Sequence, residues 1–252
     1  MKISVFPLGS RRMTCPSSIL LFCLVVFANA SQTQKVATFS IVARDHTTGE
    51  LGVAVQSKFI AVGSVVPHAR AEVGAIATQA LANPLFGPIG LDLLASGAST
   101  ESSLRTLINA DPMRDHRQLA ILGKEGNASV YTGKKCMEWA GSICGQDWAV
   151  SGNLLTGPEV LDAMALAFED ANGTLAERMI VSLRAGQKTG GDKRGRQSAA
   201  LLVVREEWGY AGLTDRLRDL RVDDHPQPIE ELERIYRLHR KLFPRVDDLK
   251  NE

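Results

Sequence analysis

The order of the periodic segments constrains the fold of this chain more than any other feature. Short apolar runs typical of β-strands come in three groups, and a pair of helical patterns separates each group from the next. Several runs carry apolar residues on both faces, as expected for a sheet that is covered on both sides. Helix pairs between groups of antiparallel strands predict an α+β fold, a sandwich of two sheet layers with helices outside.

The first group opens with the runs 38–43 and 51–57, which the turn-forming residues 47–50 join into a hairpin. Apolar residues at helical spacing then mark each helix pair, with Ser99 and Thr174 as expected N-caps. The other expected elements are strands at 61–67 and 74–79, helices around 89–94 and 104–108, strands at 118–122, 128–131 and 148–154, helices at 158–169 and 175–185, and strands at 199–204 and 208–210.

A last helix is expected beyond residue 226. Its apolar residues form a single stripe, so it should pack either on the domain or on a second copy of the chain. For this reason we expect a homodimer. The stripe consists of Ile229, Leu232, Ile235, Leu238 and Leu242.

The first thirty residues are typical of a signal peptide. Basic residues come first, the apolar run 19–27 follows, and Ala28-Asn29-Ala30 forms a small-x-small cleavage site. The apolar run is too short to span a bilayer as a helix, although an uncleaved anchor is the alternative. We therefore expect an exported protein, periplasmic or extracellular, with no stable membrane anchor after cleavage. The expected parts are a signal peptide (1–30), a flexible leader or propeptide (31–37), the main domain (38–226) and a C-terminal helix and tail (227–252).

Composition excludes some functions. The formal net charge is +1, whereas a protein that grips nucleic acid through its overall charge needs a basic excess, so no nucleic-acid partner is expected. Two of the four cysteines fall in the expected signal peptide. The other two, Cys136 and Cys144, either form a disulfide in an oxidising compartment or remain free thiols.

Four segments together resemble the DUF1028 family, and the resemblance runs from about residue 38 to about residue 225. The segments are 38–44 (TFSIVAR), 51–55 (LGVAV), 74–79 (GAIATQ) and 194–199 (RGRQSA). Members of that family have been grouped with the N-terminal nucleophile (Ntn) hydrolases, so the resemblance implies a four-layer αββα sandwich of two mainly antiparallel sheets. It implies neither a cofactor nor a metal.

The same resemblance directs attention to Thr38. In many family members the matching threonine directly follows the initiator methionine, so that removal of the methionine exposes its amine. Here residues 31–37 would still precede it after export, and a second cut at Ala37–Thr38 is required. An N-terminal threonine carries its own base, because a free α-amine has a pKa of about 7.7–8.0 and sits beside the hydroxyl.

Further residues qualify for the same chemistry. Asn153, beside Gly152 at the end of a strand, has the side chain that an oxyanion donor needs, and Asn83 is the second choice. Lys58, directly after the second strand, would favour the neutral α-amine, although an ordinary solvated lysine is the alternative. Gln79 ends the fourth run and is expected, with Asn83, to contact substrate.

The loop 190–198 concentrates positive charge. Lys193, Arg194 and Arg196 lie within four residues among glycines, an arrangement that suits a carboxylate or phosphate. The alternative is a solvated loop whose arginines pair with acids such as Asp192. Its spacing is not that of a nucleotide-binding phosphate loop.

These residues predict an exported Ntn-type hydrolase that acts on a small anionic amide. Thr38 would be the nucleophile and base, Asn153 the oxyanion donor, and Arg194 or Arg196 the anchor for the anionic group. The alternative is a non-catalytic ligand-binding or assembly protein of the same fold, with an anion site at the Arg194/Arg196 loop.

Overall fold

The computed structural model of this chain describes residues 38–245. The expected signal peptide and leader, and the last seven residues, lie outside the described residues. The described strands form two antiparallel sheets. The first has the order β10-β9-β2-β1-β8-β7 and the second the order β3-β4-β5-β6. The six-stranded sheet contains β1 (Thr38–Arg44), β2 (Leu51–Ser57), β7 (Gly141–Gly145), β8 (Trp148–Asn153), β9 (Ser198–Val204) and β10 (Arg216–Val222); the four-stranded sheet contains β3 (Pro67–Arg70), β4 (Gly74–Ala80), β5 (Arg117–Gly123) and β6 (Ala128–Thr132).

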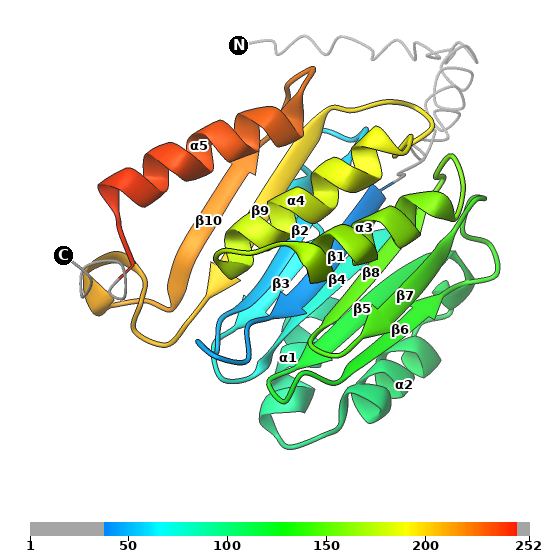
Figure 1. Cartoon of the computed structure of the whole chain (residues 1–252). Helices are drawn as coiled ribbons and strands as arrows, with labels where there is room; N and C mark the ends of the chain where they lie inside the picture. The colour runs from blue at the N-terminus through cyan, green and yellow to red at the C-terminus, as the bar shows by residue number, and fades with distance from the viewer. Residues whose placement is uncertain (1–37, 246–252) are drawn as a thin grey trace, which may run out of the picture. The chain divides into compact units, whose positions relative to one another are not determined.

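Helices cover the outer face of each sheet, which confirms the α+β sandwich (Figure 1). On the six-stranded sheet lie α3, α4 and α5, and on the four-stranded sheet lie α1 and α2. Ser99 caps α2 and Thr174 caps α4, both as expected. The helices are α1 (Phe86–Ala95), α2 (Thr100–Ala110), α3 (Glu159–Asp170), α4 (Leu175–Lys188) and α5 (Pro228–Leu242).

Alternation along the strands divides the apolar residues among three cores. In β1, Phe39 and Ile41 face the helices, whereas Val42 faces the layer between the two sheets. A third core lies between the four-stranded sheet and α1 and α2. Because Thr38 has the same parity as Val42, its side chain also faces the inter-sheet layer.

Two expected strands were wrong, and two observed strands were not expected. Residues 61–67 are not a strand, because Ala61 adopts a left-handed conformation (φ 53°) and a 3₁₀ turn, η1 (Val62–Ser64), precedes β3. Residues 208–210 lead into a second such turn, η3 (Tyr210–Gly212), and the strand there is β10 instead. That edge strand carries three arginines and one aspartate. Such charges protect a sheet edge, and they interrupt the apolar pattern by which a strand is recognised. The Gly- and Ser-containing β7 was missed for a similar reason, since it lacks an apolar run.

Helix α5 packs on the domain with part of the expected stripe. Ile229, Leu232 and Tyr236 are buried in the core beneath α3–α5, whereas Leu238 and Leu242 are exposed. The buried face of α5 therefore ends at Tyr236, and the last part of the expected stripe is not part of it. Among the described residues, no helix is both long enough and apolar enough to cross a membrane.

Candidate active site

Thr38 is the first residue of β1, a central strand of the six-stranded sheet. It pairs with Ser57 of β2 on one side and with Asn153 of β8 on the other. Its side chain is fully buried, and its Oγ1 donates a hydrogen bond of 3.1 Å to Ser57 Oγ. The fold therefore brings together two of the residues that the sequence singled out, Thr38 and Asn153, from strands more than a hundred positions apart.

The four-stranded sheet contributes two buried glutamines to the same end of the inter-sheet layer. Gln118 Oε1 accepts hydrogen bonds from Gln79 Nε2 (2.8 Å) and from Asn153 Nδ2 (3.2 Å). Gln118 Nε2 donates to the carbonyl oxygens of Gly152 (2.8 Å) and Gly141 (3.0 Å), as well as to Thr132 Oγ1. Gln118 thus ties the two sheets together and fixes the orientation of Asn153. We call the set Thr38, Ser57, Gln79, Gln118 and Asn153 the polar end of the inter-sheet layer.

This polar end holds unused hydrogen-bonding capacity. Within residues 38–245, the buried atoms Asn153 Oδ1, Gln79 Oε1 and Ser40 Oγ have no hydrogen-bond partner. The Asn153 Nδ2 group has a second hydrogen besides the one that it donates to Gln118. Buried polar groups without partners are rare in folded proteins, and here they leave the Asn153 and Gln79 side-chain oxygens available as acceptors.

Lys58 follows Ser57 directly and lies at the border of the polar end. Its backbone N–H donates to Asp192 Oδ2 at 2.9 Å. The buried Asp192 carboxylate also accepts from Arg194, through Nε at 3.1 Å and Nη2 at 2.8 Å. The Lys58 ammonium makes no ion pair with any described residue. In the loop 190–198, Arg194 is therefore paired with Asp192 of the same loop.

Arg196 takes a different direction from Arg194. Its guanidinium lies 3.7 Å from Glu230 Oε1 on α5 and is 41% exposed. The structure therefore separates the two arginines that the sequence placed in one anion site.

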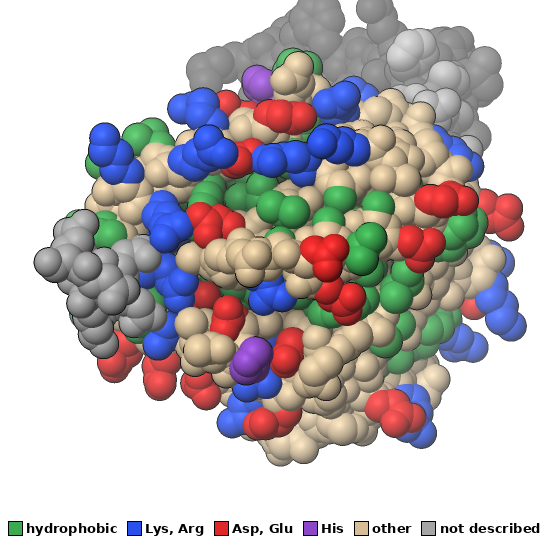
Figure 2. All heavy atoms as spheres, viewed as in Figure 1, with side chains coloured by type: hydrophobic (Ala, Val, Ile, Leu, Met, Phe, Trp, Pro, Cys, Tyr) green, Lys and Arg blue, Asp and Glu red, His purple; other side chains and the backbone are tan. Residues whose placement is uncertain are grey.

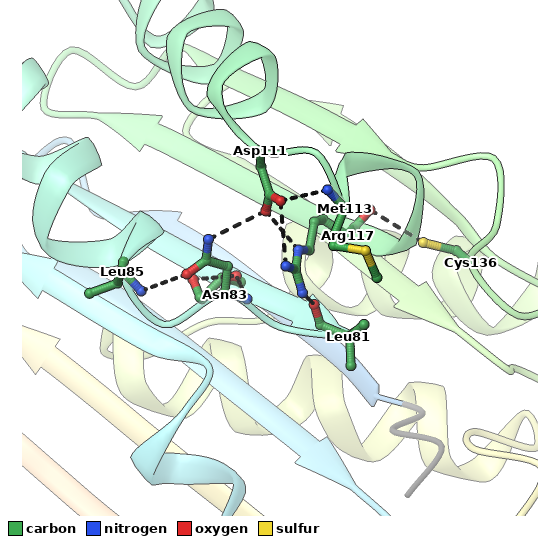
Figure 3. A network of polar contacts seen from close by, with 8 residues as sticks. Leu81, Asn83, Leu85, Asp111, Met113, Arg117 and Cys136 are labelled. Carbon is green, nitrogen blue, oxygen red and sulfur yellow. Dashed lines mark hydrogen bonds and ion pairs between the residues drawn. The ribbon is translucent and has the colours of Figure 1, made fainter. Parts of the chain in front are cut away.

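Asn83 belongs to a second polar network, shown in Figure 3. Its Nδ2 donates to Asp111 Oδ2 (3.3 Å), and Arg117 Nε donates to the same oxygen (2.8 Å). Arg117 also contacts the carbonyl oxygen of Leu81. Within the described residues, Asn83 shares no hydrogen bond with Thr38 or Asn153. Asn83 instead joins the loop before α1 to Asp111, the residue that follows α2.

Asp111 gives this network a pH dependence. Burial by itself raises the pKa of Asp111, but hydrogen bonds from Arg117, the Met113 N–H and Asn83 outweigh burial and leave the pKa below its usual value of 3.8. A lowered folded pKa means that the stabilisation is complete above pH 3.8 and is lost as the pH falls through the folded pKa.

Replacing Asp111 with Asn is therefore expected to flatten the acid side of the stability curve. The variant should lose about 1–3 kcal/mol of unfolding free energy at pH 7, because a charged hydrogen bond to Arg117 is removed. It should then lose less than the parent as the pH falls below about 4. Urea unfolding at several pH values measures both effects. Asp92→Asn is the matched control, since the Asp92 side chain is 70% exposed; parallel pH curves for the Asp111 variant and the parent would contradict the assignment.

The remaining chemistry-bearing groups of the described chain are separate from the polar end. Cys136 and Cys144 are both free thiols, and burial raises the pKa of Cys136. Cys136 Sγ donates to the carbonyl oxygen of Arg117. No group of three or more His, Cys, Asp or Glu side chains in residues 38–245 is placed to hold a metal ion.

Gln118 is the principal residue that sequence reasoning missed. A signal was present, because Gln118 shares its parity with Ala120 and Leu122, which both face the inter-sheet core. A glutamine at such a position needs buried hydrogen-bond partners. Gln79 carries the same signal in β4, with Ala75 and Ala77 on its face.

Comparison with known proteins defines the class of the chain. The pattern of the DUF1028 family, described as a family of unknown function, matches residues 38–232. The chain therefore belongs to the DUF1028 family, as its sequence segments predicted. A crystal structure of protein SPO2555 from Silicibacter pomeroyi, assigned to the same family, is 32% identical to this chain. The match covers 81% of this chain and 86% of that one, with a TM-score of 0.75. No curated protein matches significantly.

Proposed function

We propose that this protein is an N-terminal nucleophile hydrolase of a small amide, with Thr38 as the nucleophile after the residues before it have been removed. One observation carries the proposal. Thr38 begins a central strand, and its hydroxyl is buried at the polar end of the inter-sheet layer. The hydroxyl donates a hydrogen bond to Ser57, and Asn153 lies opposite Thr38 on the neighbouring strand. The Asn153 amide is fixed by Gln118 and offers the buried donor that an acyl-transfer site needs.

The chemistry follows from the groups that surround Thr38. After cleavage, the free α-amine takes the hydroxyl proton and the oxygen attacks the amide carbonyl. The amine then returns a proton to the leaving nitrogen, and water releases the acyl group in a second step. Ser57 Oγ, which accepts the hydrogen bond of Thr38 Oγ1, holds the hydroxyl in place between the two neighbouring strands.

Asn153 is suited to stabilise the negative charge that develops on the substrate oxygen. Its Nδ2 has a free hydrogen, and Gln118 fixes the amide before the substrate arrives. A preoriented donor in a buried site contributes more than one in water, because it need not reorganise during the reaction.

The positive border of the site supports an anionic substrate. Lys58 follows Ser57 in the sequence, and its ammonium makes no ion pair with a described residue. This charge can neutralise a carboxylate of the substrate or favour the neutral form of the α-amine. Arg194 lies beside Lys58, but the Asp192 carboxylate offsets the Arg194 charge, so we assign the anionic group of the substrate to Lys58. Export and homodimer formation, both expected from the sequence, are part of the proposal, and the exposed Leu238 and Leu242 of α5 are available for a contact between two copies.

The first test is the N-terminus of the mature protein. Intact mass and N-terminal sequencing of protein purified from its natural compartment should place the first residue at Thr38. The physical reason is that only a free α-amine at this position can act as the base. A mature protein that begins at Ser31 would contradict the hydrolase proposal and would favour the alternative, a non-catalytic ligand-binding protein of the same fold.

A further inference from the structure

A groove with a volume of about 390 Å³ lies between α4 and α5. Both helices belong to the layer that covers the six-stranded sheet. Four cationic and two anionic side chains line the groove, which leaves an excess of two positive charges. The cations are Arg184, Lys188, Arg196 and Arg237, and the anions are Glu230 and Glu233.

The two glutamates only partly neutralise the groove. Glu233 is shared, because Arg237 approaches it at 2.5 Å and Arg184 contacts its other oxygen. Glu230 lies 3.7 Å from Arg196, too long for a hydrogen bond. Lys188 makes no ion pair with any described residue. Arg196 and Lys188 are therefore the cations whose charges are least satisfied within the protein.

The groove and the candidate active site lie on opposite faces of the six-stranded sheet. Helix α4 packs on the sheet through Phe39, since a Cβ added at Gly186 of α4 would lie 3.5 Å from the Phe39 ring. The neighbouring side chain, Thr38, points to the other face, into the inter-sheet layer. A small molecule in the groove therefore does not reach the Thr38 hydroxyl, and the groove is a site distinct from the polar end.

The helical face concentrates positive charge visibly. In Figure 2, Lys and Arg side chains form a row across the upper part of the face that α3, α4 and α5 make. A single exposed cation attracts an anion weakly, because water screens it. Several cations around one hollow add their potentials there, and the surrounding low-dielectric protein strengthens the field.

We propose that the α4–α5 groove is a binding site for a small molecule with two or more negative charges, carried by phosphate or carboxylate groups. Arg196 offers a planar pair of donors that fits either group, and Lys188 adds a mobile ammonium on the α4 side. The Glu233 carboxylate holds Arg184 and Arg237 in place and sets the width of the groove. This site does not depend on the hydrolase proposal.

Calorimetric titration of the mature protein with inorganic phosphate, pyrophosphate and citrate tests the groove. At low salt we expect one site per chain, with the dissociation constant rising as salt is added. Lys188→Ala and Arg196→Ala should each weaken binding about three- to tenfold. Glu230→Gln should strengthen binding by a similar factor, since it removes the carboxylate that competes for Arg196.

Arg234→Ala is the matched control. Arg234 is also on α5 and exposed, but it pairs with Glu231 and does not line the groove. Its replacement removes the same charge and should leave binding within about twofold. Tighter binding of pyrophosphate than of citrate would indicate that the natural ligand of the groove is phosphorylated. Tighter binding of citrate would indicate a polycarboxylate. Equal weakening by Arg234→Ala and Lys188→Ala, or no binding of any probe at low salt, would overturn the proposal.

Discussion

Thr38→Ala is expected to abolish covalent labelling of the mature protein by a β-lactone, an electrophile that acylates an activated hydroxyl. The rate should fall by at least about 1000-fold, because alanine removes the hydroxyl that lies beside the α-amine and forms the ester. Mass spectrometry of the N-terminal peptide measures the adduct. This readout requires no knowledge of the natural substrate.

Two variants keep this experiment specific. Thr38→Ser retains a hydroxyl beside the α-amine and should keep labelling within about a hundredfold of the parent. Thr106→Ala removes an exposed threonine of α2 and should leave labelling unchanged, since its hydroxyl bonds to the carbonyl oxygen of Ser102 in the same helix. Labelling that persists in Thr38→Ala at the rate of the parent would eliminate Thr38 as the nucleophile.

Gln118→Leu is expected to lower the unfolding free energy by about 3–5 kcal/mol, since several buried groups lose their partners at roughly 1–3 kcal/mol each, partly offset by relaxation. The stranded groups are the amides of Asn153 and Gln79 and the carbonyl oxygens of Gly152 and Gly141. Leucine fills a similar volume, so the loss reports hydrogen bonds rather than a cavity. Urea unfolding at neutral pH measures it.

Two further variants distinguish the loss of this hydrogen-bond network from the loss of a glutamine elsewhere in the protein. Gln118→Glu keeps an oxygen for Asn153 and Gln79 but sets its second oxygen against the carbonyl oxygens of Gly152 and Gly141. At neutral pH it should therefore destabilise at least as much as Gln118→Leu, and it should recover stability as the pH falls. Gln197→Leu removes a partly buried glutamine whose side chain bonds to the exposed Asp224 Oδ1 at 3.1 Å, and it should cost less than about 1 kcal/mol. A loss of stability no larger for Gln118→Leu than for Gln197→Leu would show that Gln118 does not tie the sheets together.

Gln118 and Arg196 illustrate what could and could not be predicted. The period-two pattern of β5 placed Gln118 on a buried face, but nothing local names its partners, which come from β4 and β8. Arg196 was expected to act beside Arg194 because they are two positions apart. The structure pairs Arg194 with Asp192, the local alternative that the sequence had left open. Arg196 instead lies near Glu230 of α5, a contact between residues 34 positions apart that no local pattern predicts.

Sequence alone determined the elements with strong periodicity, the two helix caps, the sandwich and the family, because periodicity, capping and turn chemistry act within a few residues. It also singled out Thr38. Tertiary structure decided which groups face that hydroxyl, that Asn83 joins Asp111 instead, and that a basic groove forms between α4 and α5. Those outcomes depend on strand order and helix packing, which bring together residues far apart in the chain and which no short segment encodes.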